Sequence, residues 1–217
     1  PAFLDDYAFL ANGLIDLYEA TFDHSWLTHA SNLAGNMIAL FHDANHGGFH
    51  YSAADNEQHI KKIKEGMDGA EPSGNSMAAL CLARLGRFLD RGDYDDLAHG
   101  TLAAVAHLMH QAPHGFTQML IAADFLLGPG TEIVISGDPA HTLTCDFIRT
   151  ARAVYIPNRI LIHYFPDGRE KSLETLIPHI ADKQPIQGRS AAYVCRNFSC
   201  NEPALDADSL AAYLERS

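Results

Sequence analysis

Basic residues are scarce in this sequence. Fifteen Lys and Arg residues stand against 27 Asp and Glu residues, which gives a formal net charge of -12 at pH 7. No basic run occurs, so the electrostatic footprint of a protein that binds nucleic acid or an anionic membrane is absent. The apolar stretches also fall short of the roughly eighteen residues that a membrane span needs. We therefore expect neither nucleic acid nor a membrane among the partners.

Cysteine is also scarce, and the start of the sequence lacks a signal peptide. The four cysteines are too few and too scattered for a disulfide framework. Without the charged and apolar regions of a signal peptide, the expected location is the reducing cytoplasm. The sequence opens without an initiator Met and enters an amphipathic pattern at once. We therefore expect a piece of a longer protein.

The first part of the chain has the pattern of helices in antiparallel hairpins. Apolar residues recur at three- and four-residue steps over 5–20, 26–40, 73–88 and 98–109, and a fifth helix is predicted over about 115–127. The segment 42–72 between the hairpins is rich in Gly and polar residues. Loops of this length without structure of their own tend to be functional or mobile.

After Gly130 the pattern becomes that of a small α/β domain. Two β-rich runs, 132–136 and 159–164, flank a predicted helix over 141–153 in which Asp138 and Pro139 occupy cap and first-turn positions. Such a βαβ unit makes its two strands parallel neighbours. Further elements are predicted in this order: a helix over 173–181, the strand AAYVC, and a helix from about Asp206.

One end of the helical part is predicted to gather polar and aromatic residues. In antiparallel hairpins, the starts of the first and third helices, the long segment and the junction of the last two helices fall at the same end. We call this end the rim. Its candidate catalytic carboxylates are Asp6 and Asp68, which suit acid–base work on a polyol. The candidate substrate-binding residues are Tyr7, Phe49 and Tyr51 as stacking surfaces, with Glu71, Ser73 and Asn75 beside them.

The same rim residues also fit structural roles. Asp5 or Asp6 and Ser73 are good helix caps, and Gly74 allows two helices to approach closely. His42, His46 and His50 are spaced by four residues, which on a helix would align metal ligands. Glycines at 47 and 48 interrupt that helix, so we expect no metal and no cofactor.

Cys195 and Cys200 form a candidate thiol pair in YVCRNFSC. An odd separation sends two side chains to opposite faces of a strand, and five residues place them about 140° apart on a helix. Only a bend through RNFS would bring the sulfur atoms together. The spacing is neither that of a thioredoxin-type redox pair nor that of a zinc site. Structural, redox and metal-binding roles all stay open.

Five motifs, taken together, resemble a known family. They are DDYAFLANGLIDLYEATFD, the GGF turn, DGAEPSGNSMAAL, DFLLGP followed by EIVISGDP, and YVCRNFSC. In order and spacing they resemble the C-terminal half of the thioredoxin-domain-containing family that includes the spermatogenesis-associated thioredoxin-like proteins. The resemblance covers essentially the whole chain.

The resemblance implies a longer parent with an N-terminal thioredoxin-like domain and an (α/α)6 barrel similar to those of N-acylglucosamine 2-epimerases and six-hairpin glycosidases. The chain would then be mainly α: residues 1–129 as about five helices of a partial barrel, and residues 130–217 as a small α/β domain. In such barrels the sugar site lies at one rim, near the starts of the inner helices.

Two functions follow as expectations. The rim binds or converts a carbohydrate, or the barrel is a non-catalytic scaffold or partner-binding module for a thioredoxin-like redox domain. A partial barrel leaves its inner apolar face unpaired, which favours self-association. The expected partners are therefore a carbohydrate ligand, the remaining barrel, the thioredoxin-like domain and a second copy of the chain.

Overall fold

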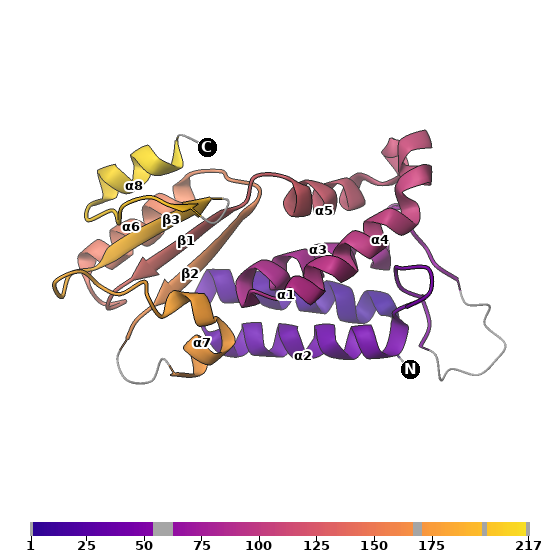
Figure 1. The fold of residues 1–217 in the computed structure, drawn as a ribbon, viewed down its shortest axis with the longest axis horizontal. Coiled ribbons are helices and arrows are strands. Elements are labelled where there is room, and N and C mark those ends of the chain that lie inside the picture. The colour runs from indigo at the N-terminus through magenta and orange to yellow at the C-terminus, as the bar shows by residue number, and fades with distance from the viewer. Residues whose placement is uncertain (1, 54–62, 167–170, 197–198, 216–217) are drawn as a thin grey trace. The chain divides into compact units, whose positions relative to one another are not determined.

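The computed structural model describes residues 2–53, 63–166, 171–196 and 199–215. The chain divides into two compact units, Pro1–Gly128 and Pro129–Ser217. The first unit is helical, and the second combines helices with a four-stranded mixed sheet (Figure 1). Within the described ranges, every helix is too short or too polar to cross a bilayer.

All five helices predicted for the first unit are present. Their bounds are α1 Leu4–Thr21, α2 His24–Phe41, α3 Gly74–Leu89, α4 Gly92–Gln111 and α5 Thr117–Leu127, with a short 3-10 helix, η1, at Pro113–Gly115. Phe22 and Asp90 adopt left-handed backbone conformations that end α1 and α3. Asp23 then caps α2 by accepting a hydrogen bond from the Ser25 amide at 2.9 Å.

The helices of this unit pack in two rows. Helix α3 lies between α1 and α5, while α2 packs against α1 and α4 packs against α3. The buried Asn12 of α1 donates to the Met77 carbonyl of α3 at 2.9 Å. Arg84 of α3 reaches back to Asp16 of α1 at 2.7 Å. These polar links fix α1 against α3 beside an apolar core that includes the fully buried Tyr18.

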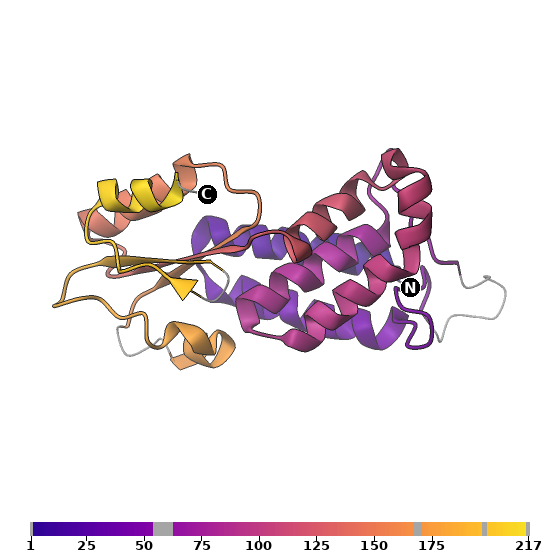
Figure 2. The ribbon, with the colours of Figure 1, turned by 45° about the horizontal axis from the view of Figure 1, so that its top comes forward.

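The second unit is built on a sheet with strand order β2-β1-β3-β4. Its elements are β1 Thr131–Ser136, α6 Thr142–Ala153, β2 Arg159–Tyr164, α7 Lys171–Leu176, η2 Pro178–Ile180, β3 Ala191–Arg196, β4 Ser199–Cys200 and α8 Ala207–Leu214. Strands β1 and β2 are parallel, which confirms the predicted βαβ unit, and β3 is antiparallel to β1. Figure 2 shows α6 and α8 on one side of the sheet and α7 on the other.

Two sequence predictions for this unit were wrong in detail. Asp138 does not cap α6, because its carboxylate accepts from the Ala140 amide in a preceding turn at 2.8 Å. The N-cap is His141, whose Nδ1 accepts from the Leu143 amide at 3.4 Å. The predicted helix 173–181 is two pieces, since Pro178 disfavours a helical conformation at the residue before it.

Candidate functional site

The structure brings the predicted rim segments together. The Leu4 amide at the start of α1 donates to the Tyr51 carbonyl at 3.1 Å, and the Asp68 amide donates to the Gly115 carbonyl at 2.7 Å. The start of α1, the described part of segment 42–72 and the junction of α4 with α5 therefore meet. Residues 54–62 of that segment lie outside the described part of the chain.

Asp68, a predicted catalytic carboxylate, lies half-buried among backbone amides. Its Oδ1 accepts from the Ser73 amide at 2.9 Å, and its Oδ2 accepts from the Gln118 amide at 2.8 Å and from the Met119 amide at 3.4 Å. The last two amides belong to the first turn of α5, whose N-cap residue, Phe116, has no side-chain acceptor. Asp68 thus caps α5 from a distant loop.

Asn75 holds the loop onto the start of α3. Its Oδ1 accepts from the Phe49 amide at 2.8 Å, and its Nδ2 donates to the carbonyls of Phe49 and Glu65, both at 2.9 Å. Asn75 is 4% exposed and Phe49 is fully buried. The prediction that Phe49 offers a stacking surface is therefore wrong, because its ring has no exposed face.

Ser73 has the capping role that its residue type suggested. Its Oγ accepts from the Ser76 amide at 3.2 Å, and the two hydroxyl groups lie 2.9 Å apart. Gly74 follows it at a close approach: a Cβ there would lie 2.1 Å from Asp5 Oδ1 and 2.9 Å from Leu4 side-chain atoms. The glycine therefore permits the contact between the starts of α1 and α3.

The remaining predicted rim residues keep at least part of their side chains at the surface. Asp6 is exposed and accepts from the Phe3 amide at 2.8 Å, which satisfies an amide at the start of α1. Tyr51 stacks on Phe3 with ring centroids 4.8 Å apart, and Tyr7 meets Phe41 edge-on at 5.4 Å.

An acidic surface surrounds these rings. Glu71 is exposed and Asp5 is half-buried. Burial, together with the negative charges of Glu65, Asp6 and Glu71, raises the pKa of the Asp5 carboxyl. Asp5 is therefore the rim carboxyl with a raised affinity for a proton.

Two of the three histidines spaced by four residues, His46 and His50, lie beside an ion pair. Lys64 Nζ lies 2.6 Å from Asp43 Oδ2, while His46 and His50 approach the same oxygen at 3.4 and 3.5 Å. The hydrogen bond from Lys64 holds the pKa of Asp43 well below its usual range. The Lys64 ammonium group thus supplies the positive charge beside Asp43. Within the ranges that the structure describes, no group of three or more His, Cys, Asp or Glu side chains is arranged to hold a metal ion.

In the second unit, Cys195 and Cys200 are joined by a disulfide. They lie directly opposite each other on β3 and β4, with Cα atoms 3.9 Å apart. The sequence argument against a cysteine pair applied only to cysteines on one continuous strand or helix. The chain instead reverses direction between Cys195 and Cys200, as the predicted bend through RNFS would require. Asn197 and Phe198, between them, lie outside the described residues.

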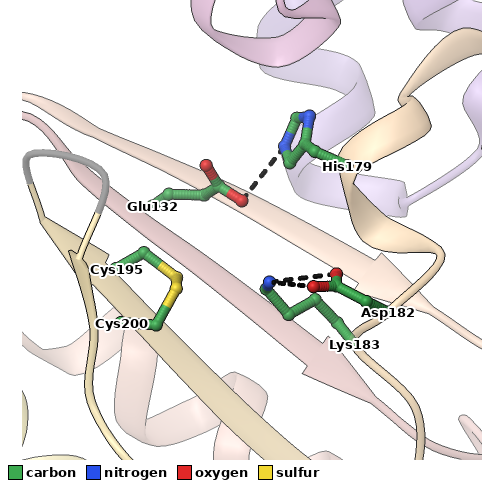
Figure 3. Close-up of a disulfide and its surroundings, with 6 residues drawn as sticks. All are labelled: Glu132, His179, Asp182, Lys183, Cys195 and Cys200. Carbon is green, nitrogen blue, oxygen red and sulfur yellow. Dashed lines mark hydrogen bonds and ion pairs between the residues drawn. A yellow bond between two sulfur atoms is a disulfide. The ribbon is translucent and has the colours of Figure 1, made fainter.

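Ionisable side chains lie on the same face as the disulfide (Figure 3). Glu132 on β1 is the register partner of Cys195, and His179 Nε2 lies 3.0 Å from Glu132 Oε1, an ion-pair distance. We call Glu132, His179, Cys195 and Cys200 the disulfide cluster. Sequence reasoning missed Glu132 and His179. The available signal was that Glu132 is the one ionisable residue in the run TEIVIS.

Hydrogen bonds hold the segment that carries His179 over the sheet. The Tyr193 hydroxyl donates to the Gln184 carbonyl at 2.5 Å, and Gln184 Nε2 donates to the Tyr164 hydroxyl at 3.0 Å. The Tyr164 hydroxyl in turn donates to Glu174 of α7. Both ends of the segment around His179 are thereby tied to strands β2 and β3.

Comparison with known proteins places the chain within longer relatives. No protein-family model matches it. Over 206 residues it is 35% identical to spermatogenesis-associated protein 20 of Homo sapiens and 34% identical to that of Mus musculus, covering 94% of this chain and 26% of each relative. An uncharacterized protein of Caenorhabditis elegans is 28% identical over 203 residues, covering 93% of this chain and 27% of that protein.

The chain therefore spans about a quarter of the length of the curated relatives it matches. It is homologous to a segment of spermatogenesis-associated protein 20, in agreement with the resemblance of its motifs. Nothing in those names specifies a ligand or a reaction.

Proposed function

We propose that the helical unit is a non-catalytic scaffold that supports other parts of a longer protein, including a thioredoxin-like redox domain. One observation carries this proposal. The polar side chains of Asp68, Ser73 and Asn75, which were candidates for sugar binding, hydrogen-bond within the chain. The polar groups of these three side chains cap helices and fix a loop. The side chains are therefore not free to bind a substrate.

The proposed scaffold is a segment of an (α/α)6 barrel, formed by residues 1–129, with residues 130–217 as an attached α/β domain. Its support is the packing order, in which α1, α3 and α5 are successive neighbours and α2 and α4 pack beside them. Alternating inner and outer helices of such a barrel would have this order. We retain the cytoplasm as the proposed location of the protein.

Helices α1 and α5, which lie at the two ends of the α1-α3-α5 row, expose apolar side chains. On α1 these are Phe9, Leu10 and Leu17, and on α5 they are Leu120, Ile121 and Leu127. Neighbouring inner helices of a complete barrel would cover both sets. The relatives, about four times longer than this chain, have the length to supply such helices. Apolar surfaces of this kind typically mark sites covered by a partner.

Carbohydrate binding is the second candidate function. It would use only the partly exposed rim groups: Asp5, Asp6, Glu71, Tyr7 and Tyr51. The observation in its favour is that the raised pKa of Asp5 occurs beside two tyrosine rings that retain some exposure. A carboxyl that binds a proton readily can donate or accept a hydrogen bond with a sugar hydroxyl.

Titration calorimetry with a panel of hexoses and N-acylhexosamines separates the two functions. It is applied to this chain and to full-length human spermatogenesis-associated protein 20. The scaffold function predicts no saturable heat with either protein. Saturable binding that Tyr51→Ala removes, while Asp146→Asn in the second unit leaves it intact, would instead establish the carbohydrate site.

A further inference from the structure

We propose that Cys195 and Cys200 form a reversible redox disulfide that exchanges with a dithiol protein, and that Glu132 and His179 carry the proton for this exchange. The proposal goes beyond the scaffold function and does not depend on it, because the disulfide cluster lies entirely in the second unit. It rests on three observations. Cys195 and Cys200 differ in exposure, Glu132 and His179 lie beside the disulfide, and the sheet has other contacts that hold it together.

The two cysteines differ in exposure. Cys200 is exposed and lies on β4, a two-residue strand at the edge of the sheet. Cys195 is only 8% exposed and lies on β3, between β1 and β4. An incoming thiolate therefore reaches Cys200 Sγ first, and Cys195 is the leaving sulfur. This asymmetry suits thiol–disulfide exchange through a single mixed disulfide.

The exchange balances in two steps. A thiolate of the partner dithiol attacks Cys200 Sγ, the Cys195–Cys200 bond breaks, and the Cys195 sulfur leaves as a thiolate that takes up a proton. The second thiol of the partner, as its thiolate, then attacks the partner's own sulfur in the mixed disulfide and releases Cys200 as a thiolate, which is protonated by solvent. The partner is oxidised to a disulfide, and this chain gains two electrons and two protons.

Glu132 is placed to serve the Cys195 sulfur. It is the antiparallel register partner of Cys195, so the two side chains lie on the same face of the sheet. His179 Nε2 lies 3.0 Å from its carboxylate, at ion-pair distance but without the geometry of a hydrogen bond. Such a pair can give a proton to the departing Cys195 thiolate and remove it again on reoxidation.

A purely structural Glu132–His179 pair fits less well. Both ring nitrogens of His179 are buried, and neither has a hydrogen-bond partner in the part of the chain that the structure describes; Nε2 meets Glu132 only at ion-pair distance. Buried polar atoms are usually paired, because an unpaired one destabilises the fold. An imidazole that is held by an ion pair alone, beside a disulfide, is suited to proton transfer.

The sheet does not depend on the disulfide. Strand β3 is paired along its whole length with β1, and the chain after β4 is held by the Asn201 amide on the Val194 carbonyl at 3.0 Å and by the bridge between Ala192 and Ala204. Reduction would therefore leave the fold in place. In the proposed cytoplasmic location, disulfides that do form are usually catalytic or redox-sensing.

The first test titrates the pair in graded mixtures of reduced and oxidised dithiothreitol, with alkylation and mass spectrometry as the readout and circular dichroism alongside. We expect Cys195 and Cys200 to interconvert as one two-electron couple with an unchanged spectrum. In Cys195→Ser, Cys200 should form a mixed disulfide with oxidised glutathione, and Cys195 in Cys200→Ser should react more slowly. A disulfide that opens only when denaturant unfolds the chain would overturn the proposal.

The second test addresses the proton. We expect Glu132→Gln and His179→Gln each to slow reduction by dithiothreitol at least tenfold at neutral pH and to leave a rate that rises with pH only as the dithiothreitol thiolate forms. Asp182→Asn is the matched control, since its carboxylate pairs with Lys183 on the same face. Variants that fold normally yet keep the parent rate and pH profile would remove Glu132 and His179 from the mechanism.

Discussion

At the scale of single residues, the rim shows how the same side-chain types serve catalysis or architecture. Asp68 and Asn75 are buried or half-buried, and their partners are backbone groups from segments far apart in the sequence. Neither role could be predicted from the sequence. The Gln118 amide that Asp68 caps lies 50 positions away, and the Phe49 amide that Asn75 binds lies 26 positions away. Ser73 was predictable, since its cap acts on the next residues of the chain.

The change Asn75→Ala tests this structural role. It would leave the Phe49 amide and two carbonyls without their partner inside the protein, so we expect the free energy of unfolding to fall by about 2–4 kcal/mol. Urea denaturation followed by circular dichroism measures the change. Asn45→Ala, at an exposed asparagine of the same loop, should alter stability by less than about 0.5 kcal/mol. Equal effects of both changes would contradict the role assigned to Asn75.

At the scale of helices and strands, local sequence signals predicted most of the fold. Apolar periodicity located all five helices of the first unit, and Asp206 caps α8 through the Ser209 amide as its residue type suggests. The errors came from Pro178, which divides a predicted helix, and from the hairpin at Cys195 and Cys200, which no periodic pattern announces. Side-chain proximity across strands, as for Glu132 and His179, depends on register and was not predictable.

The contact between α1 and α3 gives a prediction at this scale. Gly74→Ala would force a methyl group against Asp5 and Leu4, so we expect a loss of about 1–3 kcal/mol in unfolding free energy. Gly13→Ala on α1 is the matched control, because a Cβ there meets nothing within 4 Å in the described structure. Its higher helix propensity should stabilise the protein by up to about 1 kcal/mol. Thermal denaturation of both variants checks the opposite signs.

At the scale of the whole molecule, we propose that the helical unit is an incomplete scaffold. Its end helices, α1 and α5, carry apolar side chains at the surface, and about three-quarters of each mammalian relative's sequence lies outside the part that the chain covers. A ligand site would require polar groups at the rim that are free to bind. An incomplete scaffold instead requires apolar faces that are free to pair.

Light scattering coupled to size-exclusion chromatography tests this claim most directly. We expect the unsubstituted 217-residue chain to self-associate with increasing concentration. The exposed faces of two copies would cover each other, because the rest of the barrel is absent. Leu10→Lys combined with Leu17→Lys should shift it toward the mass of a single chain, whereas Arg149→Lys, an exposed control in the second unit, should not. If the unsubstituted chain stays monomeric at every concentration, the helical unit is not an incomplete scaffold.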